Sequence, residues 1–160
     1  MSVYGIMWDS ATGDYPPGAR LNAYYVNGRF AHTPYTVGRG HVWIDIFGDA
    51  PGKALFLDVE PGAAMPAQVP GWLDARAKVA GTGGIYCNRS NLAAVESAAD
   101  GRPHLLWLAT LDGTVYPTLT TTGQLVAVQA FPESMLWPGV DASVVVDSGF
   151  WSDHAAQVGT

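Results

Sequence analysis

The chain has 160 residues, 48% of them hydrophobic and 14% charged, and this composition predicts one compact domain spanning residues 1–160. Its formal net charge of −6, with no cluster of Lys or Arg, argues against nucleic acid and anionic membrane surfaces as partners. A single cysteine, Cys87, rules out an internal disulfide and a Cys-x-x-Cys metal or redox site.

The N-terminal residues lack the basic and apolar regions of a signal peptide, and no apolar run reaches transmembrane length. We therefore expect a soluble chain, and its localisation stays open. Activity outside a cell would require delivery by another route.

Eight short apolar runs of strand length follow one another along the chain, separated by segments rich in Gly and Pro. Several of them lack hydrophobic and polar alternation, which is typical of strands buried on both faces. The runs cover residues 4–9, 21–27, 41–47, 54–60, 84–88, 104–110, 125–131 and 142–147.

Two segments between these runs have helical spacing of their apolar residues. Residues 66–80, which include Trp72, are followed by Gly81, and residues 90–99 are followed by Gly101. Each strand, helix and strand in succession is long enough for a right-handed parallel crossover. This order of elements favours an α/β fold over a β-sandwich.

The predicted fold is a (β/α)8 TIM-type barrel, although such barrels typically need about 250 residues. We therefore expect a compact, partly stripped barrel with several outer helices reduced or missing. The reduction should fall in the first half, where links such as 48–53 are too short for a helix. Uncovered strands would expose apolar faces, so we also predict association into a homo-oligomer through these faces. Light scattering that shows only monomer would contradict this prediction.

Polar residues at the carboxyl ends of barrel strands are candidates for catalysis or substrate binding. Asp58 and Glu60 are the most informative pair, because residues two apart on a strand project from the same face. Carboxylates among Trp and Tyr side chains suit a sugar, which needs both hydrogen-bond acceptors and stacking surfaces. The other candidates are Asp9, Asn27, Asp45, Tyr86, Asn88, Thr110, Gln129 and Asp147, with Asp141 just before the last run.

Six segments carry a family resemblance: Trp8-Asp9-Ser10, Leu57-Asp58-Val59-Glu60, Gly84-Ile85-Tyr86, Leu106-Trp107-Leu108-Ala109, Val128-Gln129 and Gly139-Val140-Asp141. With them the chain resembles the glycoside hydrolase family 25 muramidases and, more closely, the glycoside-hydrolase-like domains of actinobacteria and their phages. The likeness spans nearly the whole chain and is most specific between Asp58 and Asn88. It implies an irregular barrel that cleaves the β-1,4 bond between N-acetylmuramic acid and N-acetylglucosamine in peptidoglycan, with no metal or organic cofactor.

The resemblance also implies roles for individual residues. Glu60 would be the general acid, with a pKa raised by its apolar surroundings and by Asp58. Asp9, Asp58 and Asp141 would be supporting carboxylates that stabilise an oxocarbenium-like centre or orient the acetamido group or water. Asp147 stays an alternative to Asp141, since Asp141 precedes the last run. The predicted substrate-binding residues are Tyr86, Trp107, Gln129, Asn27, Asp45 and Asn88.

The residues leave other interpretations open. Trp107 could be a core residue, and Asp45, Asp141 or Asp147 could stabilise turns. The first half is reduced relative to the family, which motivates an alternative function: a catalytically inactive glycan-binding or phage structural barrel. A scaffold with no ligand is a third alternative. The histidine spacing predicts no metal site, and no G-x-S-x-G segment supports a serine hydrolase.

Overall fold

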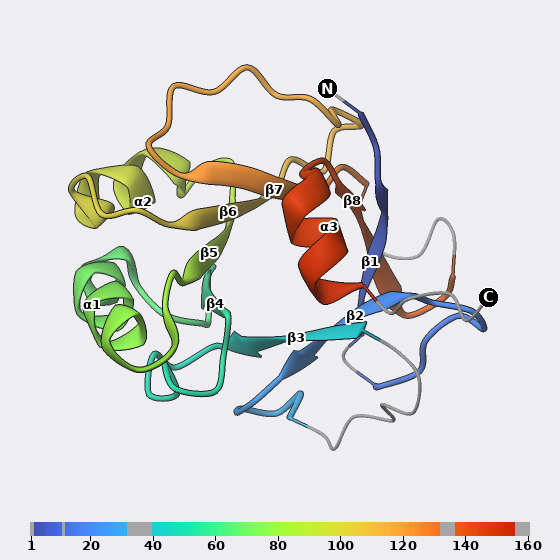
Figure 1. The fold of residues 1–160 in the computed structure, drawn as a ribbon, viewed down its shortest axis with the longest axis horizontal. Coiled ribbons are helices and arrows are strands. Elements are labelled where there is room, and N and C mark those ends of the chain that lie inside the picture. The colour runs from blue at the N-terminus through green and yellow to red at the C-terminus, as the bar shows by residue number, and fades with distance from the viewer. Residues whose placement is uncertain (1, 11, 32–39, 132–136, 156–160) are drawn as a thin grey trace.

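A computed structural model describes residues 2–10, 12–31, 40–131 and 137–155, and within them eight strands close into a barrel in sequence order (Figure 1). Each of the eight predicted runs overlaps one strand, so the number and order of the strands are confirmed. The strands are β1 (Gly5–Ser10), β2 (Leu21–Tyr25), β3 (Gly40–Asp45), β4 (Phe56–Val59), β5 (Gly84–Asn88), β6 (Leu105–Ala109), β7 (Gln124–Gln129) and β8 (Val140–Val145).

Strand direction departs from the expected pattern at β8. Strands β1 to β7 pair in parallel, whereas β8 is antiparallel to both β7 and β1. In a (β/α)8 barrel every strand would have its carboxyl end at the same opening, and this expectation is wrong for β8, whose amino end lies there instead. The run 142–147 could not reveal this, because the alternation of side chains along a strand is the same in both directions.

Two helices cover one side of the barrel, as the spacing in 66–80 and 90–99 predicts. A 3-10 turn (η1, Pro66–Gln68) leads into α1 (Val69–Ala80), and α2 (Leu92–Ala99) follows β5. Both lie outside β4, β5 and β6 in Figure 1. Trp72 and Val95 belong to the buried layer between these helices and the outward side chains of the three strands, such as Leu57 and Ile85.

A third helix, α3 (Ser148–His154), was not predicted, and it lies across the barrel at the end where β8 finishes (Figure 1). Asp147 caps it by accepting a hydrogen bond from the Phe150 backbone N–H at 2.7 Å. The Phe150 ring enters the barrel and packs edge-on against Phe56 at 5.9 Å between centroids. Next to them Trp107 is fully buried, so aromatic rings fill this end of the barrel.

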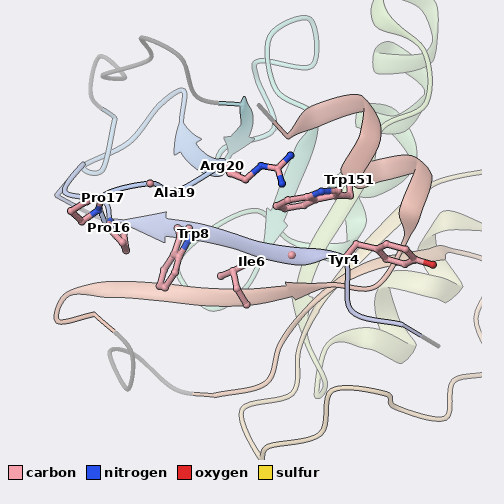
Figure 2. A pocket seen from close by; sticks show the side chains of 10 residues that line it. Tyr4, Ile6, Trp8, Pro16, Pro17, Ala19, Arg20 and Trp151 are labelled. Carbon is pink, nitrogen blue, oxygen red and sulfur yellow. The ribbon is translucent and has the colours of Figure 1, made fainter. Parts of the chain in front are cut away.

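The outer face of β1 carries no helix among the described residues. Ile6 and Trp8 project from it and, with Trp151 of α3, line a hollow of about 320 Å³ (Figure 2). The expected loss of outer helices is thus confirmed here, while self-association through such a face stays a prediction. In the ranges that the structure describes, no helix has the length and apolar character needed to cross a membrane.

Candidate active site

Four acidic side chains meet at the end of the barrel opposite α3. The interior of the sheet is lined by alternate residues, such as Phe56 on β4, and the same alternation turns Asp58 and then Glu60 toward this opening. On β1, Asp9 follows Met7 on the inner face. Across the antiparallel pair, Asp141 stands directly opposite Asp9. The reversed direction of β8 therefore brings Asp141 into the acid group.

Asp58 and Asp9 are buried carboxyls with raised pKa values. Their residues are 7% and 6% exposed. Burial raises the pKa of Asp58 to about 8, with further contributions from the charges of Glu60 and Asp9. Burial likewise raises the pKa of Asp9 to about 7, against the opposing effect of a hydrogen bond from Tyr25. At a pH above about 4 and below these pKa values, each group keeps a proton that an exposed carboxyl would have lost.

One oxygen in each of these two carboxyls is unused by the protein. Oδ1 of Asp9 and Oδ1 of Asp58 are buried, and neither has a hydrogen-bond partner among the described residues. Buried polar atoms normally have such a partner, and leaving one unpaired costs roughly 1–3 kcal/mol. Unpaired buried oxygens of this kind mark the acid group as a candidate functional site.

Glu60 is half-buried beside them. Burial raises its pKa, and the nearby charge of Asp141 raises it further. The acid therefore holds its proton to a higher pH than an exposed glutamate does, while part of its side chain still reaches solvent. A group in this state can give a proton to a bound molecule.

Two tyrosines complete the polar lining. Tyr25 donates a hydrogen bond from its hydroxyl to Oδ2 of Asp9 at 2.7 Å. Tyr86 donates to Oε1 of Gln129 at 2.7 Å, and the acids act on the Tyr86 hydroxyl electrostatically. Tyr86 and Gln129 were predicted as groove residues, whereas Tyr25 was missed. The signal was available, because Leu21, Ala23 and Tyr25 alternate onto the inner face of β2.

A hollow of about 480 Å³ opens from the acid group over the ends of β2, β3 and β4. Asp58 and Glu60 form one wall. The loop after β2 contributes Arg29 and Phe30 to the lining, and Phe47, which follows β3, also lines the hollow. Phe47 is 52% exposed, which leaves its ring open to a ligand.

Exposed aromatic rings also stand on the other side of the opening. Phe131 follows β7 and Trp137 precedes β8, and both are exposed. Because β8 is antiparallel, its amino end lies level with the carboxyl end of β7, so both rings belong to the rim. The acids thus lie between two sets of exposed aromatic side chains.

Asp45 was predicted to bind substrate, but its carboxylate is fully buried and serves the turn after β3. Asn27, another predicted binding residue, donates to Oδ1 of Asp45 at 2.7 Å, and the Trp72 indole donates to Oδ2 at 2.9 Å. Burial acts to raise the pKa of Asp45, yet these hydrogen bonds outweigh it and the pKa is lowered. The backbone donors are Phe47, Gly48 and Ala50.

Three other candidates also have internal partners. Asn88 accepts hydrogen bonds from Ser90 and from the Asn91 backbone before α2. Trp107 lies one layer below the acids, fully buried, and its indole donates to Ser143 at 2.9 Å. Asp147 caps α3 at the opposite end, which separates it from the acid group that Asp141 joins.

The arrangement is suited to proton transfer. In residues 2–10, 12–31, 40–131 and 137–155, no three His, Cys, Asp or Glu side chains are arranged to hold a metal ion. The opening contains one half-buried acid, two buried carboxyls with raised pKa values and a fourth acid opposite Asp9. Paired carboxyls in differing environments are the basis of acid and base catalysis.

Comparison with known proteins bears on the fold. No protein-family model matches this chain, and no curated protein sequence matches it. A crystal structure of an uncharacterized B. stearothermophilus protein is similar, with a TM-score of 0.62 and 14% sequence identity over 90% of this chain and 96% of that chain. At this identity the likeness supports the barrel architecture alone.

Proposed function

We propose that the protein is a peptidoglycan-directed glycoside hydrolase of muramidase type, built on a partly stripped (β/α)8 TIM-type barrel related to the family 25 enzymes. The observation that supports it most is the acid group itself. Asp58 and Asp9 are buried with raised pKa values and unused oxygens, beside a half-buried Glu60. Evolution tolerates such costly burial mainly at functional sites.

In the proposed reaction, the Glu60 carboxyl gives its proton to the glycosidic oxygen as the bond from that oxygen to the anomeric carbon breaks. The leaving sugar departs as an alcohol, and positive charge develops on the remaining ring. Asp141 and the ionised fraction of the other acids stabilise that charge, while a protonated Asp58 or Asp9 can donate a hydrogen bond to the acetamido group. Water then adds at the anomeric carbon and returns a proton to Glu60.

The rim supports a chain of sugars as substrate. Phe47 stands on one side of the acids, and Phe131 and Trp137 stand on the other. Sugar rings present apolar faces that stack on aromatic side chains. A glycan lying across the opening would place rings on both sides and one linkage above Glu60, as an enzyme that cuts within chains requires.

The replacement Glu60→Gln tests the proposal. It keeps the shape of the side chain and removes the proton donor, so we expect release of reducing ends from purified cell walls to fall roughly 10²–10⁴-fold. The melting temperature should change little. Asp153→Asn is the matched control, because it removes one charge from the exposed part of α3 at the opposite end.

A second candidate function is a glycan-binding or phage structural barrel without turnover. The internal hydrogen bonds of Asn27, Asp45 and Asn88 favour it, since they leave fewer side chains for a sugar. Saturable binding of glycan by the wild-type protein with no release of reducing ends would support this candidate and contradict the hydrolase. Equal turnover by Glu60→Gln and the wild type would contradict the role of Glu60.

A further inference from the structure

Gln129 is a buried polar side chain that the protein uses only in part. It is the last residue of β7 and is 5% exposed, and its Oε1 accepts a hydrogen bond from the Tyr86 hydroxyl at 2.7 Å. Its Nε2 has no hydrogen-bond partner among the described residues, yet it is not one of the unpaired atoms that are sealed from solvent. The amide N–H₂ group therefore reaches solvent, while the rest of the side chain is buried.

The contact with Tyr86 shows which way this amide faces. Tyr86 lies on β5 and Gln129 on β7, so the hydrogen bond between them passes β6 on the inside of the barrel. Burial raises the pKa of Tyr86 well above its usual value, and the charges of four acids raise it further: Glu60, Asp9, Asp58 and Asp141. The Tyr86 hydroxyl and the amide that it holds thus lie beside the acid group, and Nε2 meets solvent at the opening.

The main chain of Gln129 is fixed as well. Its carbonyl oxygen accepts hydrogen bonds from the backbone N–H groups of Thr110 and Leu111, at 3.0 and 3.2 Å. Leu111 makes this contact from a left-handed backbone conformation with a φ of 56°, which is unfavourable for a residue with a Cβ. Because Gln129 is held at its main chain and at Oε1, its N–H₂ group loses little further freedom when it binds a ligand.

The free end of this amide selects a hydrogen-bond acceptor, because the nitrogen of a neutral amide can only donate. Its neighbours add donors. Asp58 and Asp9 have pKa values of about 8 and about 7, so both carboxyls largely keep their protons at about pH 6. The carbonyl oxygen of an acetamido group has two lone pairs and only accepts, which matches this set of donors.

We propose that the Gln129 amide nitrogen donates a hydrogen bond to the acetamido carbonyl oxygen of a glycan bound at the acid group, and that the Tyr86 hydroxyl holds the amide in this direction. The inference rests on the proposed function for the identity of the chain. It adds that the site distinguishes an N-acetylated sugar from one with a hydroxyl at the same carbon. Gln129 is then a residue that determines specificity, and Tyr86 is its positioning residue.

NMR titration with two neutral disaccharides at about pH 6 tests this assignment. N,N′-diacetylchitobiose carries acetamido groups, and cellobiose has hydroxyls in their place on the same β-1,4 backbone. We expect the wild type to prefer diacetylchitobiose, and Gln129→Met to reduce that preference by about fivefold, the effect of one neutral hydrogen bond. The ¹H and ¹⁵N signals of the Gln129 side-chain amide, identified by their absence in Gln129→Met, should shift with diacetylchitobiose and much less with cellobiose.

Tyr86→Phe keeps the amide and removes the hydrogen bond that orients it, so we expect a smaller loss of preference, about twofold. Gln124→Met is the matched control. Gln124 is an exposed glutamine at the other end of β7, and its amide donates to Asp147. This control should keep the wild-type preference, and the Gln124 amide signals should not shift with either disaccharide.

Three results would overturn the assignment: no binding of diacetylchitobiose by the wild type, equal binding of both disaccharides, or an unchanged preference in Gln129→Met. A larger loss in Tyr86→Phe than in Gln129→Met would assign the recognition to Tyr86 and overturn it too. A preference that depends on Gln129, with no release of reducing ends from cell walls, would contradict the proposed hydrolase and support this inference. Release that depends on Glu60, with a preference independent of Gln129, would do the reverse.

Discussion

Asp45 and Asp58 lie near the carboxyl ends of the neighbouring strands β3 and β4, and their environments differ. Because Asp45 is in register with Leu57, the two carboxyl groups project from opposite faces of the sheet. Both are buried, at 0% and 7% exposure. Asp45 accepts hydrogen bonds on both oxygens, and its pKa is lowered. Asp58 has an unused buried oxygen, and its pKa is raised to about 8. The Asp45 carboxylate stabilises a turn, whereas burial of the Asp58 carboxyl with an unpaired oxygen lowers the stability of the protein.

The contrast shows which property of a buried acid indicates a functional site. Burial alone does not, because Asp45 is the more buried of the two. The distinguishing property is desolvation that internal hydrogen bonds do not offset. Stability lost at a site of this kind is typical of a trade-off between stability and activity.

The largest expected effect is the loss of stability in Asp45→Asn. The amide places an N–H₂ group where an oxygen accepts hydrogen bonds from buried donors, so several contacts are lost at once. We expect the free energy of unfolding to fall by about 3 kcal/mol at pH 7. Urea denaturation measures this loss of free energy. A loss below about 0.5 kcal/mol would contradict the claim that the hydrogen bonds of Asp45 stabilise the protein.

The same substitution at the neighbouring strand end, Asp58→Asn, should stabilise the protein at high pH. Between pH about 4 and about 8 the folded protein keeps Asp58 protonated while the unfolded chain ionises it, so wild-type stability falls as pH rises through this window. Asparagine stays neutral throughout. We expect a gain of about 2 kcal/mol at pH 8 and almost none at pH 4.

Urea denaturation of wild type and Asp58→Asn at both pH values decides this point. A gain of the same size at pH 4 and pH 8 would mean that ionisation of Asp58 is not its cause. The proposed reaction adds a second expectation, that the stabilised variant releases reducing ends more slowly than the wild type. Faster release would contradict the supporting role of Asp58.

The smallest expected effect concerns Tyr25→Phe. Its hydroxyl donates to Oδ2 of Asp9 and lowers the pKa of that carboxyl against the larger effect of burial. Without this hydrogen bond the midpoint of the Asp9 titration should rise by less than about one pH unit. The ¹³C chemical shift of the carboxyl carbon measures this midpoint. Tyr15→Phe is the control, because the Tyr15 hydroxyl donates to the Ala23 carbonyl. An unchanged Asp9 midpoint in Tyr25→Phe would show that this hydrogen bond does not hold the acid.

Much of the fold followed from local pattern. Runs of strand length between Gly and Pro marked all eight strands, and helical spacing marked α1 and α2. α3 was missed because its seven residues are short for a periodic signal, and it depends on the Asp147 cap and the burial of Phe150. The direction of β8 was missed because the side-chain pattern of an apolar run is the same for a parallel and an antiparallel strand.

The candidate site was also predictable in part from local sequence pattern. Alternation placed Asp58 and Glu60 on one face, and position at a strand end marked Asp9. It could not separate Asp58 from Asp45, since both lie near the carboxyl ends of apolar strands. Two of the donors to Asp45, the side chains of Asn27 and Trp72, come from distant segments.

The sequence by itself determined the number and order of the strands, the helices between β4 and β6, and the presence of acids at several strand ends. These follow from side-chain spacing and turn residues, which act over a few positions of the chain. Only the tertiary structure decided which acids share the opening. The antiparallel β8 brought Asp141 opposite Asp9, and the distant residues Asn27 and Trp72 gave Asp45 two of its partners while Asp58 kept an unused oxygen. A carboxyl pKa depends on solvent and charge within a few ångströms, and folding alone sets those neighbours.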